Sequence, residues 1–151
     1  MKSKSTEHPP GNLVDGNKEN YAYSYAQPDG IWIRVMLPEL TKITRIGIVN
    51  RMRCCTDDIV PPDERCTDYE CKRYIIGISV SIKMQDVTSD VVVTSCGTIT
   101  IDNNFHIFKC VGRGNVVELR KDGDVDQQNI AEIEVFKDIP APGYDILNNI
   151  I

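Results

Sequence analysis

The chain has 151 residues, of which 41% are hydrophobic, and this is enough for one domain with a core of its own. Its net charge of −5 and sequence pI near 5.0 argue against a nucleic-acid partner or an anionic membrane surface. No apolar run approaches the roughly 18–20 residues that a membrane span needs.

The cysteine count points to an oxidising compartment. Six cysteines, an even number, suit an extracellular protein with disulfide bonds. The first residues, Met1–Thr6, contain no apolar signal segment. Either a signal segment has been removed from this chain or the protein is cytosolic. The cysteines favour the first, so we expect a secreted protein.

The chain then follows a β-rich pattern. Residues 1–10 are polar and end in two prolines, which indicates a flexible arm. After them, short runs with β-branched residues and period-two alternation are separated by turn residues, and no amphipathic helix is indicated. We predict an all-β fold, a single antiparallel β-sandwich or jelly roll of about eight strands. The predicted strands are 31–37, 43–50, 74–84, 90–96, 98–102, 106–110, 116–121 and 131–137.

Two stretches depart from this pattern. Residues 56–72 contain six acidic residues, a Pro-Pro pair, Cys66 and Cys71, and we interpret them as a long surface insertion stapled by a Cys66–Cys71 bond. Residues 139–151 contain two prolines near their start and end in Ile-Leu-Asn-Asn-Ile-Ile. This composition indicates a linker or a docking tail.

Cys54 and Cys55 are adjacent, directly after Arg51-Met-Arg53. A bond between them would close a strained ring, because adjacent Cα atoms lie about 3.8 Å apart (about 2.9 Å in cis) and relaxed disulfides prefer roughly 4.4–6.8 Å. Such a ring offers a flat apolar platform beside two arginine forks, a combination that suits a sugar. Alternatively, each cysteine pairs elsewhere, with Cys66 and Cys71 as the candidates.

Four motifs, taken together, resemble the F-type lectins, or fucolectins. They are Asn-Leu-Val-Asp-Gly-Asn at 12–17, Trp-Ile-Arg-Val at 32–35, Ile-x-Ile-x-Asn-Arg-x-x-Cys-Cys at 46–55 and Ala-Glu-Ile-Glu-Val at 131–135. They occur in that family's order, and the resemblance covers residues 11–138. It implies a discoidin-like jelly roll that binds glycans without catalysis.

The resemblance also implies a set of disulfide bonds. It favours the vicinal Cys54–Cys55 bridge, keeps a family bridge as Cys96–Cys110, and leaves Cys66 and Cys71 for each other. A further family bridge has lost both partners, since Tyr25 and Ala131 stand at its positions. A loop of about 15 residues, the size closed by Cys96–Cys110, corresponds to about 3 kcal/mol in the chain-entropy model.

A structural calcium ion, one per chain, is implied by the same resemblance. Carboxylates and carbonyls are the oxygen ligands that calcium takes. The positions that match the family's ligands are Asn12, Asp15, Asn17, Ser24, Ala131 and Glu132. The alternative is a turn in which Asp15 and Glu132 are solvated. A second acidic pattern, residues 122–126, begins like an EF-hand but lacks its glycine and final glutamate, and we interpret it as a turn.

The sugar-binding motif of the family is only partly kept. Fucose-binding members carry a histidine, then Arg-x-Asp, then a second basic residue; here Arg53 replaces the aspartate and Gln27 stands near the histidine position. Tyr21, Tyr23 and Tyr25 either stack on a ligand or simply alternate along the chain. His8 and His106 do not match the family's histidine. The implied sugar-binding set is Gln27, Arg51, Arg53, Cys54, Cys55 and Arg73.

These observations favour a secreted, calcium-stabilised carbohydrate-binding module for a fucose- or galactose-type glycan, with a divergent sugar site. The alternative keeps the fold but binds an extracellular protein, as in adhesion, and is favoured by Arg53, the acidic insertion and the apolar tail. A redox role for the vicinal disulfide is a third reading, but no histidine or other base lies nearby in sequence, so no enzyme is expected. A homo-oligomer would add avidity.

Overall fold

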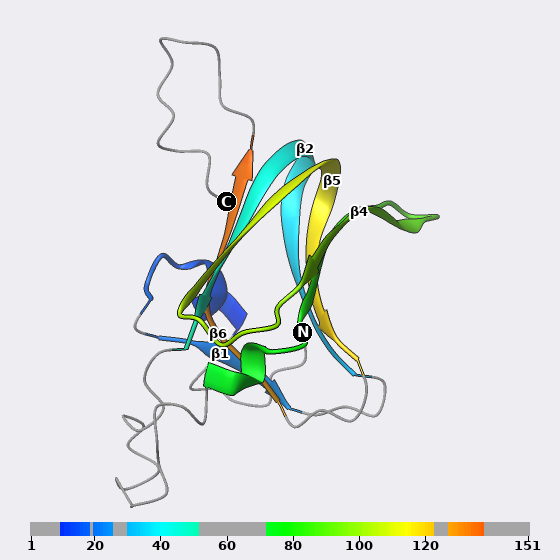
Figure 1. Ribbon diagram of the computed structural model, residues 1–151. Coiled ribbons are helices and arrows are strands. Elements are labelled where there is room, and N and C mark those ends of the chain that lie inside the picture. The colour runs from blue at the N-terminus through cyan, green and yellow to red at the C-terminus, as the bar shows by residue number, and fades with distance from the viewer. Residues whose placement is uncertain (1–9, 19, 26–29, 52–71, 123–126, 138–151) are drawn as a thin grey trace, which may run out of the picture.

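The computed structural model describes residues 10–18, 20–25, 30–51, 72–122 and 127–137. These residues form six β-strands and two short 3-10 helices, and their order along the chain is shown by colour in Figure 1. The elements are η1 (Pro10–Val14), β1 (Ala22–Tyr25), β2 (Ile31–Asn50), η2 (Arg73–Ile75), β3 (Ser79–Gln85), β4 (Asp90–Thr98), β5 (Phe105–Lys121) and β6 (Gln127–Lys137).

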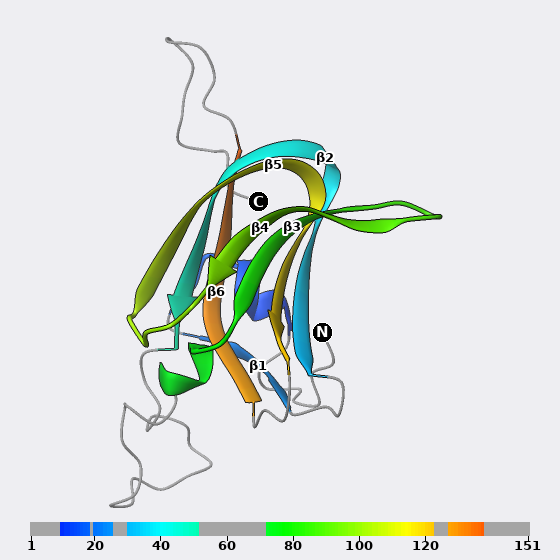
Figure 2. The ribbon, with the colours of Figure 1, turned by 45° about the vertical axis from the view of Figure 1, so that its right-hand side comes forward.

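The six strands form one antiparallel sheet in the order β1-β6-β2-β5-β3-β4, and this sheet folds over onto itself. The first part of β2 pairs with the end of β5, which also pairs with β3. The last part of β2 pairs with the start of β5 on one side and with β6 on the other. Both long strands therefore contribute to two layers, and Figure 2 shows them bending at the top of the molecule. The result is the β-sandwich that the sequence predicts.

The bend has a local cause in both long strands. In β2 the pairing with β5 is interrupted between Met36 and Thr41, where Pro38 has no N–H to give to a ladder. In β5, Gly114 lies opposite Thr41, and a Cβ atom at Gly114 would collide with the backbone oxygen of Lys83 on β3. Proline and glycine thus let the strands change partners at this point.

Side chains from both layers meet in one apolar core. Ile33, Val80 and Leu119 come from one layer, and Ile46 and Ile133 from the other, all at most 1% exposed. A Cys96–Cys110 disulfide joins β4 to β5 at the border of this core, with a Cα–Cα distance of 5.3 Å, which confirms the bond that the resemblance implied.

Several predicted strands have different bounds in the structure. Residues 31–37 and 43–50 belong to the single strand β2, and 106–110 and 116–121 belong to β5, because the strands bend without ending. The predicted strand 98–102 is wrong: β4 ends at Thr98, and the chain then forms a loop. Residues 74–84 begin with η2 and become extended only at β3, while β1 was not among the predicted strands.

The β3–β4 hairpin extends away from the sandwich, to the right in Figures 1 and 2. Its turn is fixed by Asp86, whose carboxylate accepts hydrogen bonds from the backbone N–H groups of Thr88 and Ser89. Val87 at the tip and Val91–Val93 on β4 are exposed. Within the described residues, no helix is long and apolar enough to cross a membrane.

Candidate functional site

The end of the sandwich where β2 stops also holds η2 and the loop 99–104 between β4 and β5, and we call it the loop end. In Figure 2 these segments lie together at the lower left. β5 starts there because it runs antiparallel to β2, and Val49 is paired with Phe105. The loop end therefore gathers segments that are far apart in the sequence.

Asn50, the last residue of β2, holds these segments together. Its side chain is fully buried, and its Nδ2 donates to the backbone oxygens of Lys72 at 3.0 Å and Asn103 at 3.3 Å. Its own N–H donates to the backbone oxygen of Asn104 at 2.8 Å. Because Arg51 follows Asn50 and Arg73 follows Lys72, these bonds hold the backbone segments that carry the two predicted sugar-binding arginines next to each other.

Arg51 is positioned by an aromatic ring. Its guanidinium carbon lies 3.7 Å from the centre of the Tyr21 ring, and such cation–π contacts contribute on the order of 1 kcal/mol. Tyr21 is 6% exposed and packs in a small apolar cluster with Val49 and Ala131. Tyr21 therefore stacks on this chain's own arginine.

Arg73 starts the 3-10 helix η2 and is exposed, with its guanidinium carbon 5.4 Å from the ring centre of Tyr74. The helix is anchored by Ile75, which is fully buried. Lys121 also donates to the backbone oxygen of Tyr74 at 3.1 Å. Arg73 thus projects from a segment fixed to both the core and β5.

The predicted calcium loop lies beside β6. Gly16, in the turn after η1, has a φ of 78°, a conformation that glycine adopts readily, and its N–H donates to Glu132 Oε1 at 3.1 Å. Asp15 accepts from the Asn17 N–H at 2.9 Å and from Asn20 Nδ2 at 2.7 Å. These hydrogen bonds lower the pKa of Asp15, that from Asn20 most, so the carboxyl is ionised at neutral pH.

Glu132 is 4% exposed, yet its Oε2 has no hydrogen-bond partner among the described residues, and the same holds for Oδ1 of Asn20. Burial raises the pKa of Glu132, the Gly16 N–H lowers it, and the charges of Asp15 and Glu134 raise it further. A buried carboxylate without a cation is costly, and an orphaned oxygen of this kind calls for an explanation. The Glu132 carboxylate suits a calcium ligand, because calcium binds six to eight oxygen atoms and Oε2 has no other partner among the described residues.

The other predicted calcium residues contribute in different ways. Asn12 Nδ2 donates to the backbone oxygen of Tyr21 at 3.0 Å, which ties η1 to the segment before β1. The backbone of Ser24 pairs with Gln128 in β6, and Ala131, next to Glu132, is buried. No three His, Cys, Asp or Glu side chains gather as a metal site in the part of the chain that the structure describes. An ion held here would therefore take most of its oxygens from amides and the backbone.

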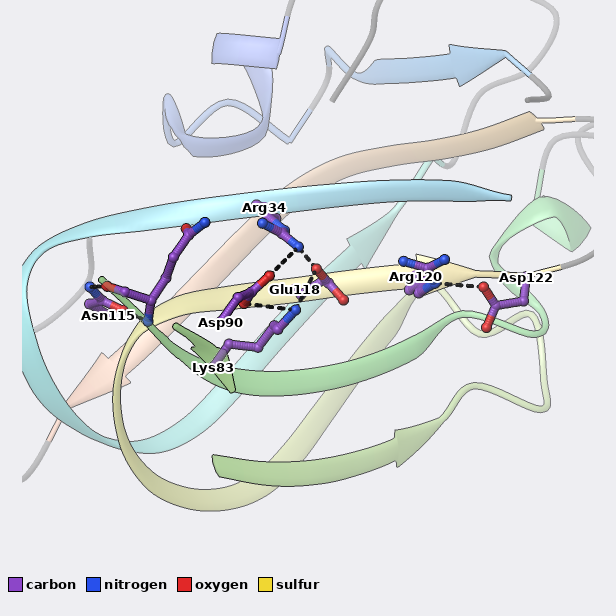
Figure 3. A network of polar contacts seen from close by, with 8 residues as sticks. Arg34, Lys83, Asp90, Asn115, Glu118, Arg120 and Asp122 are labelled. Atoms are coloured by element: carbon purple, nitrogen blue, oxygen red, sulfur yellow. Dashed lines mark hydrogen bonds and ion pairs between the residues drawn. The ribbon is translucent and has the colours of Figure 1, made fainter. Parts of the chain in front are cut away.

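A second polar cluster is built on the outer side of the β2, β5 and β3 strands (Figure 3). Glu118 Oε2 accepts from Arg34 Nε at 2.6 Å and lies 3.4 Å from Lys83 Nζ. Asp90 pairs with the same two cations, at 3.1 Å and 3.0 Å. The two cations and the two carboxylates of this cluster neutralise one another, so the cluster does not indicate a binding site for a charged ligand.

Sequence reasoning missed the residues that assemble the loop end. They are Lys72, the loop residues Asp102–Asn104 and Asn50, which a sequence motif contained without a role for it. Asn20, which bonds Asp15 at the predicted calcium loop, was also missed. The polar run Asp-Asn-Asn was an available signal for a loop. Other predictions lie outside the described residues: Gln27, Arg53, Cys54, Cys55, the Cys66–Cys71 bond, the arm before residue 10, the acidic insertion up to residue 71 and the tail.

Comparison with solved structures finds the same fold in sugar-binding proteins. The lectin domain of lectinolysin, solved with Lewis B antigen, superposes with a TM-score of 0.67 at 14% identity, over 91% of this chain and 90% of that one. A fucolectin from striped bass (Morone saxatilis) serum gives 0.65 at 15%, over 93% of this chain and 45% of that one. The family 32 carbohydrate-binding module of Clostridium perfringens NanJ, solved with galactose, gives 0.62 at 16%, over 89% and 88%.

No protein-family model matches the sequence, and no curated protein matches it as a relative. The fold is nevertheless clear: the chain has the jelly roll that F-type lectins share with family 32 carbohydrate-binding modules. The fold implied by the sequence motifs is therefore confirmed.

Proposed function

We propose that the protein is a secreted, non-catalytic carbohydrate-binding module whose sugar site lies at the loop end. The observation that supports this proposal is the Asn50 hydrogen bond to Lys72, which links the segments that carry Arg51 and Arg73 at one end of a fold shared with sugar-binding proteins. Arginine forks are suited to sugar hydroxyls, and charge-assisted hydrogen bonds contribute roughly 1.5–3 kcal/mol each. Gln27, Arg53 and the Cys54–Cys55 platform complete the proposed site, and the Cys96–Cys110 bond supports an oxidising compartment.

The proposed module is stabilised by one calcium ion held between the turn after η1 and β6. Asp15 and Glu132 supply the charges, and amide or backbone oxygens of Asn12, Asn17, Ser24 and Ala131 supply further ligands. To this predicted set we add Asn20, whose Oδ1 is buried without a partner among the described residues. The ion would neutralise the buried Glu132 carboxylate. Since it lies in a supporting loop, its proposed role is structural.

The first experiment is a glycan array with fucosylated and galactosylated structures, screened with calcium and again with a chelator. We expect binding to a defined glycan that weakens when calcium is removed. Arg51→Ala should abolish it, because this guanidinium is held in place by Tyr21. Lys42→Ala, an exposed change within β2, is the matched control. A blank array with a folded, calcium-responsive protein would contradict the sugar site.

One observation favours the alternative, an adhesion module that binds an extracellular protein. The projecting β3–β4 hairpin exposes Met84, Val87 and Val91–Val93, and exposed apolar patches of this kind mark protein contacts. Adhesion of the purified protein to glycosidase-treated cells separates the two functions. Adhesion that is lost with the V91T/V93T double variant and kept with Arg51→Ala would favour the protein partner; the opposite pattern favours the glycan.

A further inference from the structure

The loop end contains a hollow beside the two arginines. Its volume is about 420 Å³, and it is lined by Lys72, Asp102, Asn103 and Asn104. This volume falls within the roughly 300–1,000 Å³ that small-molecule sites span. The hollow adjoins the proposed sugar site, because Lys72 precedes Arg73 directly in the chain.

The main chain around the hollow is fixed by buried hydrogen bonds. Asn50 donates to the backbone oxygens of all four lining residues. Its side-chain Nδ2 contacts those of Lys72, Asn103 and, at 3.5 Å, Asp102. Its backbone N–H donates to that of Asn104. The ring of His106 adds a contact of 3.0 Å to the backbone oxygen of Asn103. The backbone of the lining is therefore held in place by buried hydrogen bonds, and the four side chains start from fixed positions.

The chemistry of the lining suits a hydroxylated ligand with an acidic group. The two amides can donate to and accept from hydroxyl groups, the carboxylate of Asp102 can accept from them, and Lys72 adds an ammonium. Together with Arg51 and Arg73, the described residues here carry three cations against the single acid Asp102. The ammonium of Lys72, in the lining itself, is the group with which an acidic substituent of a sugar would pair.

We propose that this hollow binds a second sugar residue whose carboxylate or sulfate pairs with Lys72. This inference rests on the sugar site proposed above, and it narrows the ligand to an acidic glycan of at least two residues. The first residue would lie at Arg51 and Arg73 and the second in the hollow.

The test is calorimetric titration of the full chain, with calcium, with three related glycans. The probes are the Lewis a trisaccharide, which carries both fucose and galactose, its 3′-sulfated form and its 3′-sialylated form. We expect the acidic forms to bind about tenfold more tightly than the neutral one, as one charge-assisted contact allows. A preference for only one of the two forms would identify the acidic group as sulfate or carboxylate.

Two substitutions place the effect in the hollow. Lys72→Gln should weaken binding of the acidic forms about tenfold, to the level of the neutral form, and the fold should be kept because the bond to Asn50 uses only the Lys72 backbone oxygen. Asp102→Asn should strengthen acidic binding by about two- to fivefold, a gain that misfolding does not produce. Lys42→Gln is the control and should change neither.

The outcomes separate this inference from the proposed function. If the neutral glycan binds and the acidic forms bind no more tightly, the inference is wrong and the sugar site stands. If the acidic preference survives Lys72→Gln, the acidic group lies elsewhere and the hollow is not its site. If none of the three glycans binds, the proposed sugar site itself fails for its fucose- and galactose-type ligands, and this inference fails with it.

Discussion

Two glutamates in different layers of the sandwich are buried to nearly the same degree but have opposite surroundings. Glu118 on β5 is 5% exposed and accepts from Arg34, with Lys83 close by, whereas Glu132 on β6 is 4% exposed and receives one backbone N–H. The first carboxylate is neutralised by the protein's own cations, as Figure 3 shows. The second leaves one oxygen without a partner among the described residues. This difference supports the proposal that Glu132 binds a cation from solution.

The largest expected effect concerns the paired glutamate. Glu118→Gln leaves Arg34 and Lys83 with Asp90 as their remaining partner in the cluster, and breaking a buried ion pair costs about 3 kcal/mol of unfolding free energy. Urea unfolding of the variant measures this loss, and calcium should not restore it. Glu39→Gln, at an exposed position, should stay within about 0.5 kcal/mol. A loss below about 1 kcal/mol for Glu118→Gln would show that Asp90 alone balances the two cations.

Calcium bound at Glu132, the other glutamate, should change the free energy of unfolding by a comparable amount. At a concentration of one hundred times its Kd, calcium would add about 2.7 kcal/mol to the free energy of unfolding. For a chain of this size that corresponds to roughly 5–10 °C in Tm. Glu132→Gln should remove the response, while Glu118→Gln should keep it in full. If Glu132→Gln shows the same calcium-dependent shift as the unmodified protein, the ion does not bind at this carboxylate.

The sequence predicted much of this fold but little of how its ends are assembled. Residues Asp15 and Glu132 were paired through family motifs, and the structure does place Glu132 against Gly16, the residue after Asp15. The strand break expected near Pro38 is absent, because β2 changes partners there and continues. Asn50 was part of a quoted motif but was given no role, because its contacts with Lys72 and Asn103 are made across the fold. No local pattern in the sequence encodes such contacts.

The raised pKa of Glu132 also predicts a pH dependence of stability. Without calcium, the raised pKa of Glu132 means that the folded state binds its proton more tightly than the unfolded state does. Stability from this group is present below its ordinary pKa and is lost as pH rises through the raised value. Glu132→Gln should therefore stabilise the calcium-free protein at pH 7, on the order of 1 kcal/mol.

The difference in stability between Glu132→Gln and the unmodified protein, followed by thermal unfolding from pH 4 to 8 in chelator, isolates this group. The lowered pKa of Asp15 gives the opposite slope at acidic pH, but both proteins contain it, so it cancels. A difference that stays flat with pH would mean that Glu132 is not titrating in this range.

The smallest effect concerns Lys18, an exposed cation near Glu132. Its Nζ lies 3.6 Å from Glu134 Oε1, with the lysine side chain 51% exposed, and its charge lowers the pKa of Glu132. Because this cation competes with calcium for the same negative field, Lys18→Met should tighten calcium binding by about twofold. Calcium titration followed by calorimetry measures the change, with Lys42→Met as the control. Weaker calcium binding in Lys18→Met would show that Lys18 stabilises the calcium site. It would contradict the prediction that Lys18 competes with calcium.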